Sequence, residues 1–137
     1  MLLSIDEGNR QPIYLQIVRQ IKEQILVREL NAGDELPSVR DLGDTLGISL
    51  HTARSAYQVL AEEGLLRIRL GKKARIASVP DTIGWERFAD DFALRVRELI
   101  VDGLLQGSEL SDLHRLVDAE HEALMARGVG DKGKDSA

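Results

Sequence analysis

The chain has 137 residues, of which 43% are hydrophobic, and it carries a formal net charge of −5. This length suits one domain or a small domain with an accessory piece, and the apolar content excludes a disordered chain. Cysteine is absent, which excludes a disulfide framework, a thiol nucleophile and a cysteine-ligated metal. The sequence shows neither a secretory signal nor the ~18 apolar residues in a row that span a bilayer, so we expect a cytoplasmic protein.

The charge is distributed unevenly along the chain. Residues 1–80 contain eleven basic and ten acidic side chains, whereas residues 81–137 contain seven and thirteen. Within residues 64–80 there are five basic side chains and no acidic one. DNA binding depends on local neutralisation of phosphates, so this run suits a nucleic-acid interface despite the negative total. Taken alone, it fits a solvated surface equally well.

The first predicted element is an amphipathic helix over residues 12–29. Pro12 suits a first helical turn, because its missing N–H is not needed there. Isoleucine then recurs at every fourth position from Ile13 to Ile25, which places an apolar stripe along one face. The Asn-Ala-Gly-Asp stretch at 31–34 breaks this pattern.

Two further helices joined by a tight turn are predicted next. Ser38 can cap a short helix, and Gly47 stands where a helix end favours a left-handed residue. Ser49 can cap a third helix over residues 50–63, and Gly64 ends it. This arrangement is the outline of a helix-turn-helix.

From Leu65 the apolar period changes to two. Apolar residues from Leu66 to Leu70 alternate with two arginines, which predicts a strand with one face on the core and basic groups outward. Gly71 and the two lysines after it form the predicted tip, and residues 74–77 form the return strand. A basic hairpin of this kind after a helix-turn-helix is a wing, which grips phosphate beside the helix in the major groove.

The rest of the chain predicts a helical hairpin. Apolar residues recur with coiled-coil-like spacing in two stretches, separated by Gly107, which ends the first helix, and Ser108, which caps the second. So small a hairpin lacks a core of its own, and a second copy of the chain is the simplest partner for its aromatic side chains. The expected dimer interface comprises Trp85, Phe88, Phe92, Val96, Leu99, Leu113, Val117, His121 and Leu124.

We therefore expect a mainly α fold with a small β wing. A winged helix-turn-helix would cover residues 1–79, a two-helix dimerisation and effector region residues 80–127, and a disordered tail residues 128–137. Pro80 marks the boundary, because the residue before a proline avoids helical geometry.

The third helix carries the candidate base contacts near its start, since the N-terminal residues of a recognition helix lie nearest the base edges. Arg54 can contact a guanine through both its N7 and O6 atoms, while Ser, Thr and His side chains can bond to bases or phosphate. Any one of these side chains could simply be exposed, but their occurrence in register indicates function. The expected DNA-binding residues are Arg40, Ser49, Leu50, His51, Thr52, Arg54, Ser55, Gly71, Lys72 and Lys73.

These elements resemble the GntR family of bacterial transcription regulators over nearly all of residues 11–77. The resemblance implies that Arg40, residues 49–54 and the Gly71 wing tip contact double-stranded DNA, usually a palindromic operator bound by a dimer. The matching motifs lie at residues 12–17, 33–42 and 47–49, and continue with Thr52-Ala53-Arg54, Tyr57, Leu60 and Glu63-Gly64-Leu65.

Two departures from the family pattern affect the expected contacts. Leu50 stands where the family often has arginine, so we expect one base contact to be missing or replaced by contact with a thymine methyl. Lys73 and Arg75 stand in the wing, where the family commonly has smaller residues and an aromatic one. A non-consensus operator and a larger share of phosphate contacts are therefore expected.

Only 57 residues follow position 80, fewer than the family's larger effector domains need. The short two-helix tail resembles the YtrA subfamily, whose members often control neighbouring ABC-transporter genes. The resemblance implies a homodimeric repressor of a nearby operon that responds to an effector.

Three other hypotheses compete with this one. His114, Asp118 and His121 share one helical face at a spacing that can hold a divalent ion, but polar positions at the edge of a dimer interface explain them better, so no metal or cofactor is predicted. The sequence has no phosphate-binding glycine loop, nucleophile elbow or apolar carboxylate pair, so we expect no enzyme. The remaining alternative is a winged helix used for protein–protein interaction without specific DNA binding, which Leu50 keeps open.

An effector pocket, if one forms, is expected between the helical hairpin and the winged helix. Trp85, Phe88, Phe92 and Arg95 are its candidate lining residues, although packing in a core is the favoured role for them.

Overall fold

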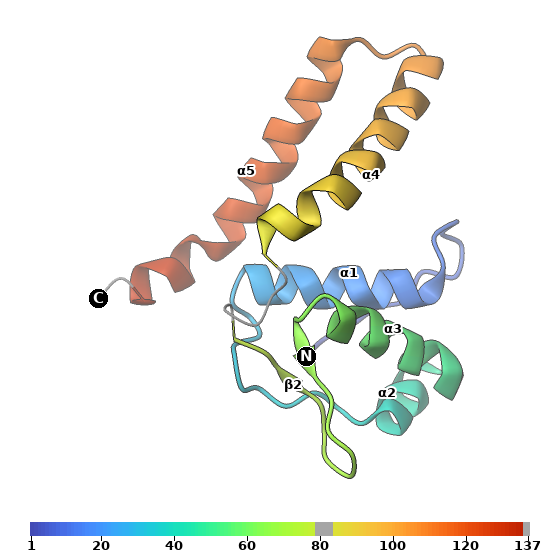
Figure 1. Cartoon of the computed structure of the whole chain (residues 1–137), viewed down its shortest axis with the longest axis vertical. Helices are drawn as coiled ribbons and strands as arrows, with labels where there is room; N and C mark the ends of the chain where they lie inside the picture. The colour runs from blue at the N-terminus through green and yellow to red at the C-terminus, as the bar shows by residue number, and fades with distance from the viewer. Residues whose placement is uncertain (79–83, 136–137) are drawn as a thin grey trace. The chain divides into compact units, whose positions relative to one another are not determined.

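The computed structural model describes the backbone of residues 1–78 and 84–135 (Figure 1). Contacts within the chain divide it into two compact units, Met1–Thr82 and Ile83–Ala137. The predicted boundary at 79/80 lies outside the described residues. The described part is mainly helical with one small antiparallel sheet, as the sequence predicts.

The first unit contains a three-helix core and a short hairpin. Its two strands pair antiparallel, with Leu66 opposite Ile76 and Arg67 opposite Arg75. The elements are α1 (Ile13–Leu26), α2 (Val39–Leu46), α3 (Leu50–Glu62), β1 (Leu66–Arg67) and β2 (Arg75–Ile76).

One apolar core holds the first unit together. Buried residues of α3 recur with helical spacing and therefore form a single stripe that packs against the isoleucines of α1. The core consists of Ile17, Val18, Ile21, Leu30, Leu36, Leu42, Ala53, Ala56, Tyr57, Leu60, Leu66, Ala74 and Ile76.

Local capping signals set the bounds of α2 and α3, as predicted. The Asp41 N–H donates to Ser38 Oγ at 3.0 Å, and the Thr52 N–H donates to Ser49 Oγ at 3.1 Å. Gly47 ends α2 in the left-handed conformation, with a φ of 68°. Both helix starts and the turn between them are therefore confirmed.

The predicted end of α1 at residue 29 is wrong by three residues. The helix ends at Leu26, and Arg28 adopts a left-handed φ of 64°. The Gln24 carbonyl accepts hydrogen bonds from the N–H groups of Glu29 (2.8 Å) and Leu30 (3.0 Å), which closes the helix. An arginine occupies the position where glycine is the usual signal, so the sequence pattern did not indicate this end.

The predicted strand over residues 66–70 is also shorter in the structure. β1 ends at Arg67, while Ile68 and Leu70 are 52% and 103% exposed and do not pack on the core. Alternation correctly places Leu66 inside, but the hairpin then extends past the edge of the core. Gly71 has a φ of 74°, and the Lys72 N–H donates to the Arg69 carbonyl at 3.1 Å, which forms a tight turn at the tip.

The N-terminal segment is fastened to α1 by three glutamines that are one helical turn apart. Their side-chain amides bond to the main chain of alternate residues in this segment at 2.6–3.0 Å. The spacing of the glutamines matches the spacing of their partners, because four helical residues rise about 6.0 Å and two extended residues rise about 6.7 Å. The pairs are Gln16 with Asp6, Gln20 with Ser4, and Gln24 with Leu2.

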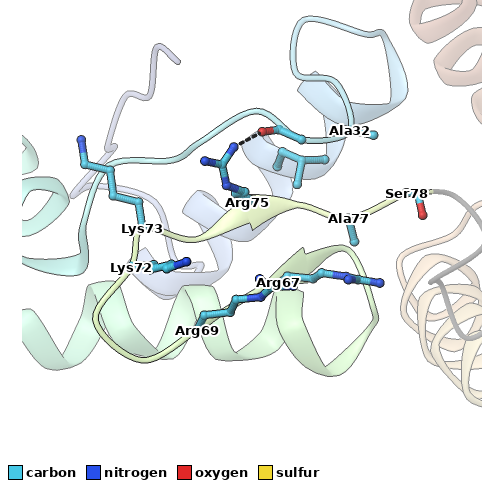
Figure 2. A pocket seen from close by; sticks show the side chains of 10 residues that line it. Ala32, Arg67, Arg69, Lys72, Lys73, Arg75, Ala77 and Ser78 are labelled. Carbon is cyan, nitrogen blue, oxygen red and sulfur yellow. Dashed lines mark hydrogen bonds between the residues drawn. The ribbon is translucent and has the colours of Figure 1, made fainter.

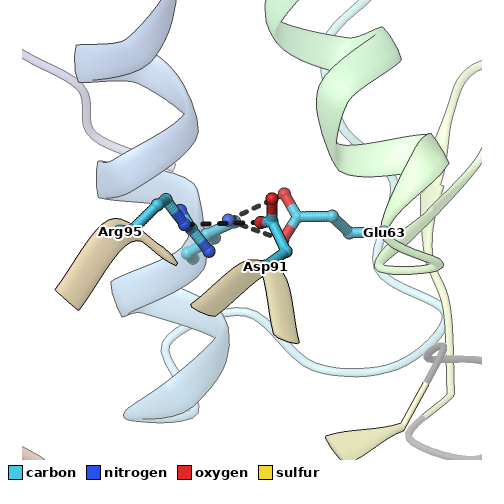
Figure 3. Close-up of polar contacts among 4 residues, drawn as sticks. Glu63, Asp91 and Arg95 are labelled. Atoms are coloured by element: carbon cyan, nitrogen blue, oxygen red, sulfur yellow. Dashed lines mark hydrogen bonds and ion pairs between the residues drawn. The ribbon is translucent and has the colours of Figure 1, made fainter. Parts of the chain in front are cut away.

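An ion pair joins α1 to the end of α3. Lys22 Nζ lies 2.7 Å from Glu63 Oε2 and 2.8 Å from Glu63 Oε1, and both side chains are partly buried (Figure 3). This bridge reinforces the contact between the two helices that make most of the core.

The second unit is an antiparallel pair of helices, α4 (Trp85–Leu105) and α5 (Leu110–Asp135) (Figure 1). The two helices approach closely near their connection. A Cβ at Gly103 would lie 3.0 Å from Ser108 Oγ and 3.3 Å from a methyl carbon of Leu113, so a larger residue would not fit there without movement.

None of the described helices is both long enough and apolar enough to cross a membrane.

Both predicted ends of the last helix need correction. The helix begins at Leu110, and the Glu109 N–H donates to the Asp112 carboxylate at 2.8 Å, whereas Ser108 Oγ is buried without a hydrogen-bond partner among the described residues. At its other end α5 continues to Asp135, through most of the tail predicted as disordered over 128–137. Glycine costs a helix only about 1 kcal/mol per residue, so the glycines of this segment disfavour a helix without preventing it. Residues 136–137 lie outside the described residues.

Tyr57 carries the buried polar group of the core. Its hydroxyl donates to the Pro37 carbonyl at 2.6 Å, which ties α3 to the segment before α2. Burial raises the pKa of this phenol above its ordinary value.

We expect Tyr57→Phe to lower the free energy of unfolding at neutral pH by about 1 kcal/mol, because the Pro37 carbonyl loses its donor. The wild type should also lose stability as the pH rises above ~10, since the phenol ionises there in the unfolded chain but not in the folded one. Urea denaturation at neutral and alkaline pH checks both effects, with Tyr14→Phe as the matched control. Equal alkaline losses in the wild type and Tyr57→Phe would contradict the assignment.

Candidate nucleic-acid interface

The start of α3 presents a polar face to solvent. The stripe containing Ala53 and Ala56 packs on the core, so side chains on the other side of the helix must point outward. His51 and Arg54 are exposed, and Leu50 is 40% exposed. The leading end of this helix is therefore open to a large partner.

Ser49 and Thr52 fix the conformation of this first turn. Ser49 Oγ accepts from the Thr52 N–H at 3.1 Å and lies 2.8 Å from Thr52 Oγ1. The two hydroxyls are thus engaged with each other, which holds the first turn rigid. The N-terminal end of the helix also carries partial positive charge, which favours a nearby phosphate.

All the predicted DNA-binding residues belong to the first unit. Thr52 and Ser55 are half-buried, and the other predicted residues are exposed. Arg40 lies in the first turn of α2, one residue after its start. Direct contact of these residues with DNA stays a prediction.

The wing is anchored to the chain segment that precedes α2. The Leu36 N–H donates to the Ala74 carbonyl at 2.9 Å, and the Gly33 N–H donates to the Ile76 carbonyl at 2.8 Å. The Arg75 guanidinium donates to the Gly33 carbonyl at 2.9 Å and pairs with the Glu35 carboxylate. Arg75 was expected to add charge to the tip, but these bonds make it a positioning residue for the wing.

A groove of about 610 Å³ runs along one side of the wing (Figure 2), and we call it the wing groove. Five of its lining side chains are basic, and none of the described lining residues is acidic. The sequence pattern predicted outward basic groups at Arg67 and Arg69 but did not place them in a site. The lining residues are Ala32, Gly33, Arg67, Arg69, Lys72, Lys73, Arg75, Ile76, Ala77 and Ser78.

The second unit exposes a large apolar surface. No residue of α4 is buried in the single chain. Trp85 and Phe92 stack edge to face with ring centres 5.3 Å apart, and Arg95 lies 5.2 Å from the centre of the Phe88 ring. Arg95 also pairs with Asp91 at 3.5 Å (Figure 3). The four candidate pocket residues therefore form one cluster along α4.

Most of the predicted dimer-interface residues are exposed in the single chain. Phe88, Leu113 and Leu124 are half-buried, and the other residues of that set are exposed. Ile100 and Val101 lie in the same surface hollow of α4 as Trp85, although the sequence pattern had left them out. They continue the apolar face along the helix.

Within the described part of the chain, no group of three or more His, Asp or Glu side chains could hold a metal ion. His114, Asp118 and His121 therefore form no such cluster. The effector pocket expected between the hairpin and the winged helix stays a prediction.

Comparison with known proteins agrees with this architecture. Residues 13–76 match the family model described as bacterial regulatory proteins, gntR family. The HTH-type transcriptional repressor YtrA of Bacillus subtilis (strain 168) is 32% identical over 116 residues, which cover 85% of this chain and 89% of that protein. The HTH-type transcriptional repressor NagR of the same strain is 34% identical over 132 residues, which cover 93% of this chain and 51% of that protein.

Solved structures agree as well. YtrA from Sulfolobus acidocaldarius, described as a GntR-family transcription factor, has a TM-score of 0.57 and 32% identity, with 72% of this chain and 99% of that chain covered. A protein of Listeria monocytogenes EGD-e, described as a transcriptional antiterminator, has a TM-score of 0.81 and 27% identity, with 90% and 92% covered. These relatives are regulators rather than enzymes, and they do not favour the protein-interaction alternative.

We expect Ser49→Ala to lower the free energy of unfolding by about 1 kcal/mol, because the first turn of α3 loses its cap. Ser49→Asp should retain most of that stability, since a carboxylate can cap the same N–H groups. Urea denaturation of both variants, with Ser4→Ala as the matched control, checks the expectation. Equal stability of Ser49→Ala and the wild type would show that the cap contributes nothing.

Proposed function

Because the chain belongs to the GntR family of bacterial regulatory proteins, we propose that it is a homodimeric transcriptional repressor that binds a palindromic operator in the bacterial cytoplasm. Family membership makes it a DNA-binding transcriptional regulator. What we propose beyond this is that it represses rather than activates, that it forms a dimer, and which residues contact the operator. The repressor activity of its relatives YtrA and NagR supports the sign.

The observation that carries the proposal is the open, Ser49-capped start of α3 in a unit that also bears a lysine-tipped wing. In the proposed complex this end of α3 enters the major groove. Arg54 donates to a guanine, and His51 bonds to a base edge or a phosphate. Leu50 contacts a thymine methyl, which makes the operator depart from the family consensus.

The remaining predicted residues hold the protein on the sugar–phosphate backbone. Lys72 and Lys73 at the wing tip and Arg40 at the start of α2 are exposed cations that suit phosphate contacts. Such contacts add affinity and orientation without selecting a sequence. Selection is therefore assigned to the first two turns of α3.

The exposed apolar residues of α4 and α5 support the proposed dimer. Trp85 is 64% exposed, Leu99 68% and Val117 67% in the single chain, and soluble monomers rarely expose so much contiguous apolar surface. A two-fold dimer covers these residues and presents two winged units to two half-sites, whose spacing follows from the dimer. An effector would act by changing the relative pose of these two units.

We expect Arg54→Ala and Lys72→Ala to separate sequence selection from phosphate contact. A duplex selected by the protein from a random-sequence pool and a scrambled duplex serve as probes in a salt titration. Arg54→Ala should lose about 1–3 kcal/mol on the selected duplex and little on the scrambled one. Lys72→Ala should weaken both equally and reduce the log–log salt slope by about 0.9 per protomer. Arg19→Ala, which removes an exposed cation of α1, is the control.

Two outcomes of this titration would contradict the proposed contacts. A salt slope indistinguishable from zero would favour the protein-interaction alternative. An unchanged preference for the selected duplex in Arg54→Ala would exclude the assigned base contact.

We expect Phe92→Glu to convert the dimer to a monomer, because two carboxylates would be buried in an apolar interface. Sedimentation equilibrium measures the change. Leu2→Glu, which places the same charge on a residue that is 90% exposed outside α4, should remain dimeric. A wild-type chain that is monomeric at micromolar concentration would contradict the proposal.

A further inference from the structure

We propose that α4 pairs antiparallel with α4 of a second copy, and that Asp90 and Arg97 fix the register of this pair through two symmetric ion pairs. The inference rests on the proposed function, since it needs the chain to form a dimer. It adds the direction and the register of the two helices. It also assigns a role to two charged side chains that neither the core nor the DNA-binding site uses.

The surface hollow of α4 is apolar except for one acidic and one basic side chain. Asp90 and Arg97 both line it, beside apolar residues such as Val96 and Ile100, and both are exposed. Neither has a hydrogen-bond or ion-pair partner within the described part of the chain. A partner that covers the hollow must therefore offer apolar surface and one charge of each sign.

Asp90 and Arg97 cannot neutralise each other within one helix. Seven residues of α-helix make almost two full turns and rise about 10.5 Å, so the two side chains share a face but lie too far apart to pair. A second copy carries both of the missing charges at the same separation. In a two-fold pair, moreover, a contact from residue 90 to residue 97 is always repeated from 97 to 90.

Only antiparallel pairing brings the opposite charges together. With the two-fold axis midway between residues 90 and 97, Asp90 lies level with the partner's Arg97, on the same edge of the interface. In a parallel pair each charge lies level with its own copy, and the opposite charge is about 10.5 Å further along the axis. Such a pair would cover the charges with apolar side chains and leave them unpaired, which is unfavourable.

The apolar residues of the hollow fit the same register. Ala93 lies next to the proposed axis, where the two backbones come nearest, and its small side chain allows the close end of the usual 8–10 Å separation of helices. Trp85 lies about level with the partner's Val101, so its large ring meets a smaller side chain. The residues of the hollow are therefore self-complementary in size as well as in charge.

Single cysteines can measure the register, because the chain contains no cysteine of its own. Position 93 of one copy lies about 1.5 Å along the axis from position 93 of the other, so Ala93→Cys should form a disulfide-linked dimer on mild oxidation. Ala89→Cys is the matched control in the same hollow. Its two thiols would be about 13.5 Å apart along the axis, beyond the reach of a disulfide. Electrophoresis without reductant measures both.

Charge reversal tests the ion pairs themselves. Asp90→Arg and Arg97→Asp should each raise the dissociation constant of the dimer about tenfold, because two like-charge contacts replace two ion pairs. The double variant Asp90→Arg/Arg97→Asp should recover the wild-type value. An equimolar mixture of the two single variants should recover it too, as a heterodimer in which every pair is again opposite in sign.

Sedimentation equilibrium measures these dissociation constants. Asp102→Arg makes the same charge change on an exposed residue of α4 outside the hollow, and it should leave the dimer unchanged. Far-UV circular dichroism shows whether each variant keeps its helices. If a charge variant loses helix, the two cysteine variants still decide the register.

Three results would overturn the inference. Cross-linking of Ala89→Cys as readily as Ala93→Cys would indicate a parallel pair. Cross-linking of neither would show that something other than the partner's α4 covers the hollow. The third is a loss in the single variants that neither the double variant nor the mixture recovers. All three leave the proposed dimer standing, whereas a monomeric wild type would contradict the dimer and the register together.

Discussion

The packing of α1 on α3 determines which side of α3 faces solvent. Ala53 and Ala56 are fully buried, and their small side chains let the isoleucines of α1 approach closely. A helix advances about 100° per residue, so fixing this stripe also fixes the direction of Arg54 on the other side. The same core holds Leu66 and Ile76 at the base of the wing. Recognition helix and wing are therefore oriented by one set of apolar contacts.

Elements governed by nearby residues could be predicted from the sequence, and elements governed by distant ones could not. Ser38, Gly47 and Ser49 act within four positions, so the bounds of the helix-turn-helix followed from local rules. Ile68 alternates correctly for a strand, yet its exposure depends on where the core ends. The partner of Arg75 is 40 residues away in Glu35, and no local pattern indicates that pair.

The residues of the candidate site show the same contrast between local patterns and distant contacts. Arg54 and the wing lysines follow from their positions in recognisable elements, whereas the wing groove needs the turn at 32–33 to lie against β2. The apolar repeat of α4 correctly indicated a helix, and no residue of α4 is buried in the single chain, while the partner for its apolar face stays a prediction. The sequence could not show that Ser108 would be enclosed beside Gly103, because that contact depends on the approach of two helices.

The glutamine pairs at the N-terminus determine how this part of the chain can vary. Within residues 1–6 their bonds reach main-chain atoms of residues 2, 4 and 6, so the side chains of Leu2 and Ser4 can change without breaking them, although proline would remove the donors at 4 and 6. The Asp6 side chain is constrained separately, because its carboxylate accepts from the Gly8 N–H at 3.0 Å. Inserting or deleting one residue would instead turn Leu3 and Ile5 away from the core that they partly cover. Substitutions in this N-terminal segment should therefore be tolerated far more easily than changes in its length.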